Sequence, residues 1–379
     1  MDFMEFLNQN APCYVYDKEI IENNCKNLKK VIPNVKFLYS IKANPFEKVV
    51  ETISNQGFGS DAASSNEVLL SIKAGMKKED IFYSTPGKTE EDIEKVWGKC
   101  TIIADSFHEL NLIEQKAIEK NCKIDVGVRI NPNFSMFDED IKSSKFGIDE
   151  DQFLNANLNF THLNIVGIHV HVQSQILNPD ILARYYYNCF NLANKIGLKY
   201  DIKFINFGSG IGTLYNKDKL KEFDFTPIKK VIEDISGRIS AKLYIETGRY
   251  VVCDSGTFYT PVVDKKVSVD KTYVVVKSGI NGFLRPGMAV LLNNPEKGYE
   301  PFYTMQNQSQ FDVLSDATEK EKVDIVGSLC TALDVLAKDI SIKKAEIRDI
   351  ISISNAGSYA YSLTPLKFAS HDLPKEFLK

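Results

Sequence analysis

Eight short apolar runs, separated mostly by amphipathic stretches, constrain the part of this chain before residue 250 more than any other feature. Two of the intervening segments, 47–53 and 66–75, space their apolar residues about 3.6 apart, as helices on a core do. Strands that alternate with helices predict a parallel α/β structure, and eight strands match a (β/α)8 barrel. The predicted strands are 37–43, 57–60, 81–84, 101–104, 125–130, 165–172, 203–207 and 243–246.

The pattern changes after about residue 250 to β-branched runs that are separated by turns. The runs 273–277, 322–327 and 350–354 predict strands of a separate sheet, and the early run 13–17 is also strand-like. A length of 379 residues exceeds one ordinary domain. The chain is therefore expected to form two domains, with a boundary near residue 250.

Composition narrows the class of protein. The chain is 44% hydrophobic and 25% charged, as ordered soluble proteins are, and its net charge of -4 with no basic stripe gives no reason to expect nucleic acid. It shows neither a signal peptide nor an apolar segment of about 20 residues, so we expect no membrane segment and a cytoplasmic location. The odd number of scattered cysteines, never spaced C-x-x-C, suggests reduced thiols and no zinc site. They are Cys13, Cys25, Cys100, Cys122, Cys189, Cys253 and Cys330.

Polar residues at the carboxyl ends of the predicted strands are the first candidates for chemistry, because a (β/α)8 barrel holds its active site there. They are Lys42, Asp61, Asp105, Arg129, His171, the turn 208–210 and Glu246.

Lys42 is the candidate nucleophile. It ends an apolar run, and Asn44 and Pro45 then stop the strand. An amine at the end of a buried strand has a pKa lowered by desolvation and can attack a carbonyl, which is how a protein holds an aldehyde cofactor. A lysine that reaches past the strand to water is the other interpretation, and this stretch alone leaves both open.

The glycine-rich turn Gly208-Ser209-Gly210 follows the seventh predicted strand. Its backbone amides can converge on an anion, and barrels often bind phosphate near strands seven and eight. A tight structural turn explains the same glycines until a phosphate-bearing ligand is argued from elsewhere.

His169 and His171 share one face of the sixth predicted strand, with His171 nearer the loop. No third ligand matches them, so we expect no metal, core packing for His169 and a site role for His171. Glu246 ends the eighth strand, where a buried carboxylate requires a partner, either a protonated ring nitrogen or Arg249. Cys330 would by default be a small core residue, although polar residues follow it.

Taken together, these motifs give a specific resemblance. The chain resembles the fold-type III pyridoxal-phosphate decarboxylases, the group that contains diaminopimelate decarboxylase and eukaryotic-type ornithine decarboxylase. The resemblance runs nearly end to end, and the motifs follow the family's order. They are Tyr-Ser-Ile-Lys-Ala-Asn at 39–44, Lys145-Phe146-Gly147, His-Val-Gln-Ser-Gln at 171–175, Gly-Ser-Gly at 208–210, Glu-Thr-Gly-Arg at 246–249, Cys330, and Ala-Gly-Ser-Tyr at 356–359.

The resemblance implies a pyridoxal-phosphate-binding barrel at 17–248 and a β-sandwich-like domain at 249–379 that the strand within residues 1–16 joins, as in the alanine racemase and decarboxylase type. It also implies a head-to-tail homodimer whose two active sites are each completed across the interface. The implied substrate is an amino acid as a small molecule, and the implied activity is that of a decarboxylating lyase of amino-acid metabolism.

Roles for single residues also come from the resemblance. Lys42 would link covalently to the cofactor, His171 would stack on its ring, and Glu246 would pair with the pyridine nitrogen and keep it protonated. Cys330 of the other subunit would return a proton to Cα, for which a thiol with a pKa of about 8 to 9 is suited. The phosphate would be held by Ser174, Gly208, Ser209, Gly210 and Tyr359, and Lys145 and Asp334 match an interchain ion pair.

The substrate is where the sequence departs from the best-known relatives. Diaminopimelate decarboxylases follow the cysteine with Glu-Ser-Gly-Asp, and that glutamate recognises the distal amino group, whereas this chain has Thr331-Ala332-Leu333-Asp334. The aspartate that ornithine decarboxylases carry there is also missing. Arg249 and Arg285 match positions that bind a distal carboxylate, but the tyrosine expected four residues after Arg285 is Ala289.

The expected substrate is therefore an L-amino acid or derivative with an acidic or extended distal group, free or bound to a carrier protein, and Thr331 is a candidate contact. The first alternative is diaminopimelate decarboxylase, which makes L-lysine. Further alternatives are an amino-acid racemase, which would face the ring nitrogen with arginine instead of Glu246, and a non-catalytic homologue, which would be expected to have lost Lys42 or its partners.

Overall fold

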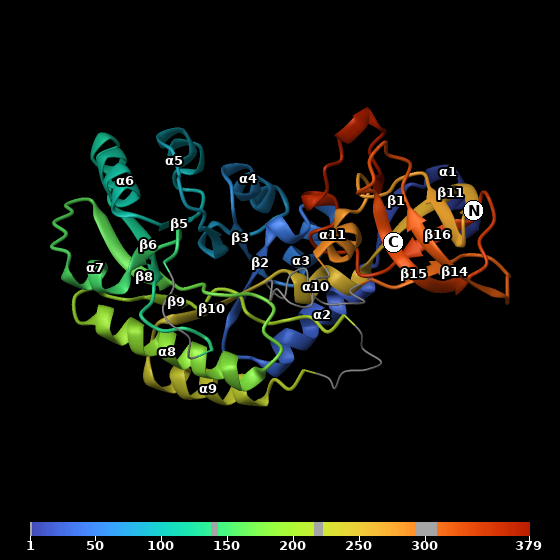
Figure 1. Cartoon of the computed structure of the whole chain (residues 1–379). Helices are drawn as coiled ribbons and strands as arrows, with labels where there is room; N and C mark the ends of the chain where they lie inside the picture. The colour runs from blue at the N-terminus through green and yellow to red at the C-terminus, as the bar shows by residue number, and fades with distance from the viewer. Residues whose placement is uncertain (1, 138–142, 216–222, 293–308) are drawn as a thin grey trace. The chain divides into compact units, whose positions relative to one another are not determined.

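The computed structural model describes residues 2–137, 143–215, 223–292 and 309–379 (Figure 1). Contacts divide the chain into two units. One unit consists of Glu22–Gly212 and Glu222–Gly248, and the other of Met1–Ile21, Thr213–Lys221 and Arg249–Lys379. Residues 17–21 and 213–215, which the sequence analysis assigned to the barrel, thus belong to the second unit.

The first unit is a closed parallel barrel, as predicted. Each strand pairs in parallel with its neighbours in the order β5-β4-β3-β2-β10-β9-β8-β6, and pairing of β5 with β6 closes the ring. A two-residue strand, β7 (Ile148–Asp149), pairs with β6 outside the ring. The barrel strands are β2 (Lys36–Ser40), β3 (Gly59–Ala62), β4 (Ile81–Tyr83), β5 (Thr101–Ala104), β6 (Ile124–Asn131), β8 (Leu163–His169), β9 (Phe204–Asn206) and β10 (Lys242–Thr247).

Helices surround these strands, and their ends follow from local capping. The side chains of Ser64, Thr89 and Ser106 each accept the backbone N–H three residues later, which starts α4, α5 and α6. Figure 1 shows α4, α5 and α6 in a row on one side of the barrel and α8 beside α9 on another. The helices are α2 (Lys18–Val31), α3 (Glu47–Asn55), α4 (Ser65–Lys73), α5 (Glu90–Val96), α6 (Phe107–Glu119), α7 (Glu150–Asn155), α8 (Pro179–Gly197) and α9 (Thr226–Arg238).

Phe204 of β9 fills the barrel interior, and two glycines make room for it. Gly127 and Gly167 are register partners on β6 and β8. A Cβ at Gly167 would lie 2.3 Å from the Phe204 ring, and one at Gly127 would lie 2.8 Å from it. The ring packs edge-on against Phe82, with 5.2 Å between centroids. The core of the barrel thus requires an aromatic residue on β9 and no side chain at the facing positions of β8 and of β6, the next strand along.

The second unit is built on a mixed sheet in the order β13-β16-β11-β12-β14-β15. β1 pairs antiparallel with β11 and parallel with β17, so the amino-terminal strand belongs to this sheet. The strands are β1 (Cys13–Tyr16), β11 (Gly256–Ser268), β12 (Lys271–Val276), β13 (Phe311–Val313), β14 (Lys320–Val326), β15 (Val335–Lys343), β16 (Ile350–Ile353) and β17 (Lys375–Leu378), with the helices α1 (Phe3–Asn10), α10 (Arg249–Val252) and α11 (Leu284–Leu292).

Two further observations concern the cysteines and the possibility of a membrane-spanning helix. All seven cysteines are free. Among the described residues, no helix combines the length and apolarity that crossing a membrane would need.

Gly167→Ala should destabilise the barrel by about 1–3 kcal/mol, because the new methyl group would overlap the Phe204 ring. Chemical unfolding followed by circular dichroism measures this. Gly197→Ala is the matched control, since a Cβ there would meet nothing within 4 Å at the end of α8, and it should be neutral or stabilise by up to about 1 kcal/mol. Equal stability of Gly167→Ala and the unchanged protein would contradict this packing.

Candidate active site

Lys42 lies just past the end of β2, in a 3-10 turn formed by Ile41–Ala43. Its Nζ donates a hydrogen bond to Oδ2 of Asp61 at 2.7 Å, and its side chain is 46% exposed. Of the two interpretations that the sequence left open, this exposure favours a lysine that reaches past the strand toward water, because the strand stops at Ser40 and Lys42 lies in the turn that follows. The amine is positioned by an ion pair.

Asp61, on the neighbouring strand β3, is the partner that fixes Lys42. Its carboxylate is fully buried and also accepts hydrogen bonds from the hydroxyl groups of Ser40, at 3.0 Å, and Ser84. Ser40 and Asp61 are register partners in the β2–β3 pair. The sequence placed Asp61 at a strand end but gave it no role, because its contact with Lys42 follows from strand register and not from a motif.

Glu246 on β10 lies beside the strand that leads to Lys42, since it is the register partner of Leu38 on β2. Its Oε1 lies 3.1 Å from Nε2 of His169 and accepts a hydrogen bond from Nδ2 of Asn206 at 2.8 Å. Burial raises the pKa of Glu246, but its interactions with His169, Lys42 and His171 outweigh burial and lower that pKa below its usual range. Glu246 is therefore a carboxylate at neutral pH.

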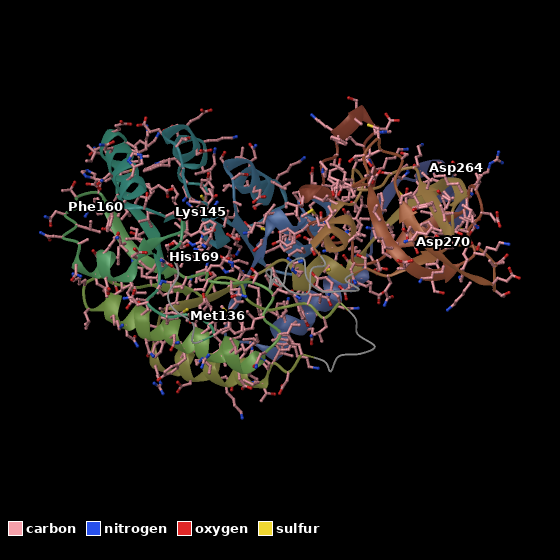
Figure 2. All side chains as sticks on the ribbon, viewed as in Figure 1. Met136, Lys145, Phe160, His169, Asp264 and Asp270 are labelled. Atoms are coloured by element: carbon pink, nitrogen blue, oxygen red, sulfur yellow. The ribbon has the colours of Figure 1, made fainter. Side chains whose placement is uncertain are left out.

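The two histidines have different partners. His169, which we expected to pack in the core, is buried inside the barrel unit (Figure 2), and its ring contacts Glu246. Nδ1 of His171 accepts the backbone N–H of Ser209 at 3.2 Å, so the ring proton is assigned to Nε2, which lies 3.4 Å from Oγ of Ser174. Burial lowers the pKa of His171 to about 3, which makes this ring neutral. The described residues contain no group of three or more His, Cys, Asp or Glu that could hold a metal ion.

The turn 208–210 requires its glycines. Gly208 has a φ of +67°, and a Cβ there would lie 2.4 Å from the carbonyl oxygen of Val170; at Gly210, with a φ of +150°, it would lie 2.5 Å from Leu182. Oδ1 of Asn206 accepts the N–H of Gly208 at 2.9 Å. Because Asn206 also donates to Glu246, one side chain ties the glycine turn to the buried carboxylate.

The motif Lys145-Phe146-Gly147 folds against two residues from strand ends. The Arg129 guanidinium lies 4.4 Å from the centroid of the Phe146 ring, and Gly147 donates its N–H to Oδ2 of Asp105 at 3.0 Å. Nζ of Lys145 lies 4.9 Å from the same ring. The predicted pairing of Lys145 with Asp334 joins two chains and stays a prediction.

Arg249 and Tyr359 come together in the second unit. The Arg249 guanidinium lies 4.7 Å from the centroid of the Tyr359 ring and donates to the hydroxyl of Tyr215 at 2.6 Å. Arg249 was predicted to bind substrate and Tyr359 to bind phosphate, so the structure brings residues with different predicted roles into one cluster.

Arg285 has a structural task in the same unit. Its side chain is 1% exposed, and its guanidinium donates to the carbonyl oxygen of Ser358 at 2.9 Å and to that of Asn355. These carbonyl groups belong to the loop that leads into Tyr359, which has a φ of +49°. The arginine that the sequence assigned to a substrate carboxylate thus holds the backbone of this loop.

Cys330 lies exposed in the loop 327–334. Thr331 is half-buried, and its hydroxyl accepts the N–H of Leu333 at 3.3 Å. Asp334, at the end of the loop, is 2% exposed, and its two carboxylate oxygens accept the N–H groups of Ile280 and Leu329.

Comparison with known proteins decides the family. The profile described as "Pyridoxal-dependent decarboxylase, pyridoxal binding domain" matches residues 18–253. The chain belongs to this decarboxylase family.

Individual relatives agree with this assignment. L-glutamyl-[BtrI acyl-carrier protein] decarboxylase from Niallia circulans is 30% identical to this chain, and the match covers 97% of this chain and 89% of the relative. Diaminopimelate decarboxylase from Helicobacter pylori strain J99 is 29% identical, and the match covers 94% of this chain and 88% of the relative. A crystal structure of diaminopimelate decarboxylase from Helicobacter pylori complexed with L-lysine matches with a TM-score of 0.86 at 26% identity, covering 100% of this chain and 94% of that one.

Membership confirms that the chain is a pyridoxal-phosphate-dependent carboxy-lyase. The barrel's residues fit that cofactor chemically. Lys42 supplies an exposed amine that can react with an aldehyde, and Glu246 supplies a buried carboxylate that can pair with a pyridinium nitrogen. The turn at Gly208 has no room for a side chain, which leaves its backbone amides available to a phosphate.

Lys42→Ala should abolish covalent attachment of pyridoxal phosphate. In the unchanged enzyme, borohydride reduction should remove the absorbance band of the lysine-linked cofactor and leave the cofactor on the peptide that contains Lys42, as detected by mass spectrometry. Lys36→Ala is the control, because Lys36 begins the same strand and pairs with Asp80 at 3.0 Å. Cofactor found on another lysine would disprove the assignment.

The apoprotein should become less stable as the pH falls, because the folded protein resists protonation of His171. This residue has a folded-state pKa of about 3, below the usual value of about 6.5, so the unfolded chain binds the proton more readily between these values. The stabilisation is complete above about pH 6.5 and is lost toward pH 3, at no more than about 1.4 kcal/mol per pH unit. His171→Gln should flatten this dependence in urea unfolding between pH 7 and 5, and parallel curves would contradict the assignment.

Proposed function

We propose that this enzyme removes the α-carboxylate of an L-amino acid or derivative whose distal group is acidic or extended, including an aminoacyl group bound to a carrier protein. The relative from Niallia circulans, whose name describes a decarboxylase of a carrier-bound glutamyl group, supports this choice. The choice depends on what the loop around Cys330 offers to a substrate.

The loop 327–334 offers no free carboxylate. Its one acidic residue, Asp334, is buried and directs both carboxylate oxygens to backbone N–H groups. Thr331 and the exposed Ala332 and Leu333 complete the run after Cys330. A distal ammonium group would therefore find no anion in this loop, whereas an uncharged linker could lie along it without burying an unpaired charge.

The barrel residues have separable tasks in the proposed reaction. Lys42 binds the cofactor covalently, and Asp61 orients its amine at 2.7 Å. Glu246 stays ionised because His169 and Asn206 contact its Oε1, and as a carboxylate it would keep the pyridine nitrogen of a bound cofactor protonated. His171, a neutral ring, can stack on an aromatic ring without adding a positive charge beside it. Ser174 and the turn 208–210 are proposed to hold the phosphate, and Tyr359 stays a predicted phosphate contact.

Proton return completes the reaction. The bound cofactor supplies an electron sink for the pair of electrons that remains at Cα when the carboxylate departs as carbon dioxide. We assign the proton that Cα then requires to the thiol of Cys330 from a second copy of the chain, so the proposal includes the homodimer that the resemblance implies. The thiolate left behind regains a proton from water.

Diaminopimelate decarboxylase is the second candidate, because several relatives carry that name and Arg249 and Arg285 are both present. The contacts of Arg285 weigh against its binding the distal carboxylate of diaminopimelate or of any other acidic substrate, and so favour an extended substrate over diaminopimelate. A guanidinium that is 1% exposed and donates to two backbone carbonyl groups would have to break those bonds to bind a distal carboxylate.

Carbon dioxide release from a substrate panel tests the proposal. The panel comprises diaminopimelate, lysine, ornithine, glutamate and carrier-linked aminoacyl groups, and we expect the highest kcat/KM with glutamate or a carrier-linked member. Thr331→Glu, which places a carboxylate beside Cys330, should raise the preference for diaminopimelate by about tenfold through charge pairing, whereas the uncharged control Thr331→Gln should not. Far better turnover of meso-diaminopimelate by the unchanged enzyme would refute the proposal.

A further inference from the structure

The carboxylate of Asp334 joins two segments of its own chain. Oδ1 accepts the N–H of Ile280 at 2.8 Å, and Oδ2 accepts the N–H of Leu329 at 2.9 Å. The residue is 2% exposed. A buried carboxylate that satisfies two buried amide donors is costly to remove, because both donors would lose their acceptors.

Two glycines are shaped around the same carboxylate. A Cβ at Gly279 would lie 2.1 Å from Oδ1, and a Cβ at Gly327 would lie 2.1 Å from Oδ2. Real Cβ atoms do not approach other atoms so closely, so the chain can pass on both sides of Asp334 only without side chains. Both glycines and the aspartate therefore form one packed unit.

Backbone hydrogen bonds close the loop over this unit. Gly327 donates its N–H to the carbonyl oxygen of Asp334 at 2.9 Å, and Asp334 donates its own to that of Thr331 at 3.2 Å. Leu329, whose amide Asp334 binds, directly precedes the exposed Cys330. The position of the thiol is thus set by an anchor one residue before it and another four residues after it.

We propose that Asp334 is a positioning residue that acts within its own subunit to set the place and orientation of the Cys330 thiol. This role rests on the proposed function, in which Cys330 returns the proton. It differs from the interchain ion pair with Lys145 that the sequence suggests, because a carboxylate that is 2% exposed presents little surface to an ammonium group of another chain.

Labelling of Cys330 tests the positioning. Iodoacetamide is applied to the full-length holoenzyme, and modification of Cys330 is followed by peptide mass spectrometry, since the other six cysteines are buried or half-buried. Asp334→Asn keeps the shape but turns one acceptor into a donor, so the labelling rate should rise about tenfold as the loop opens. A rate within twofold of the unchanged enzyme would overturn the proposal.

Matched variants separate the possible causes. Asp324→Asn is the control, because Asp324 is also buried and accepts a backbone N–H, that of Asp339 at 2.7 Å; its Cys330 labelling rate should stay within twofold of the unchanged enzyme. Lys145→Met should also leave the rate within twofold, and a rise equal to that of Asp334→Asn would show that the ion pair is what matters. Gly327→Ala, which crowds the same carboxylate, should raise the Cys330 labelling rate. It replaces Asp334→Asn in the test if that variant does not fold.

A double-mutant cycle connects the position of the thiol to the reaction. With the best substrate of the panel, Asp334→Asn should lower kcat about tenfold with KM within twofold, and it should have no further effect in a Cys330→Ala background. Effects that multiply would show that Asp334 does not act through Cys330. If no member of the panel releases carbon dioxide, the proposed function fails, and the labelling rates still decide the positioning.

Discussion

A carboxylate inside a barrel is costly unless hydrogen-bond donors and positive charge surround it, and the rest of the barrel site is arranged to meet this requirement for Glu246. The β10 strand that carries Glu246 lies between β2, which leads to Lys42, and β9, which carries Asn206. His169 reaches the same carboxylate from β8. Four successive strands thus contribute to one electrostatic cluster, and the parallel register brings their carboxyl ends to one rim.

The strand count and the strand-end residues of the barrel could be predicted from sequence because each depends on local pattern. Short apolar runs between amphipathic segments identify strands, and a polar residue that ends such a run must lie at the rim. The contacts of Asp61 with Lys42 and of Asn206 with Glu246 could not be predicted, since they depend on which strands are neighbours and at what register. The exposure of Lys42 could not be decided from the sequence, because an apolar run does not reveal that its last three residues leave the strand.

The second unit shows a different limit. Arg285 and Asp334 each match a motif position with a known partner, a substrate carboxylate for one and a lysine of another chain for the other. In the structure each satisfies the backbone of its own unit. A motif specifies residue type and spacing, but a guanidinium or a carboxylate can form the same hydrogen bonds with a ligand or with the backbone of a loop. Only the burial of the side chain and the direction of its hydrogen bonds separate the two uses.

Asn206 has a consequence for anyone who would redesign this enzyme. Its amide nitrogen serves the carboxylate proposed to face the cofactor ring, and its amide oxygen serves the turn proposed to hold the phosphate. A change that shifts this amide alters both ends of the cofactor site at once. Accepting a truncated vitamin analogue by remodelling only the phosphate end would therefore also disturb the electronic character of the ring, and the two properties would have to be re-optimised together.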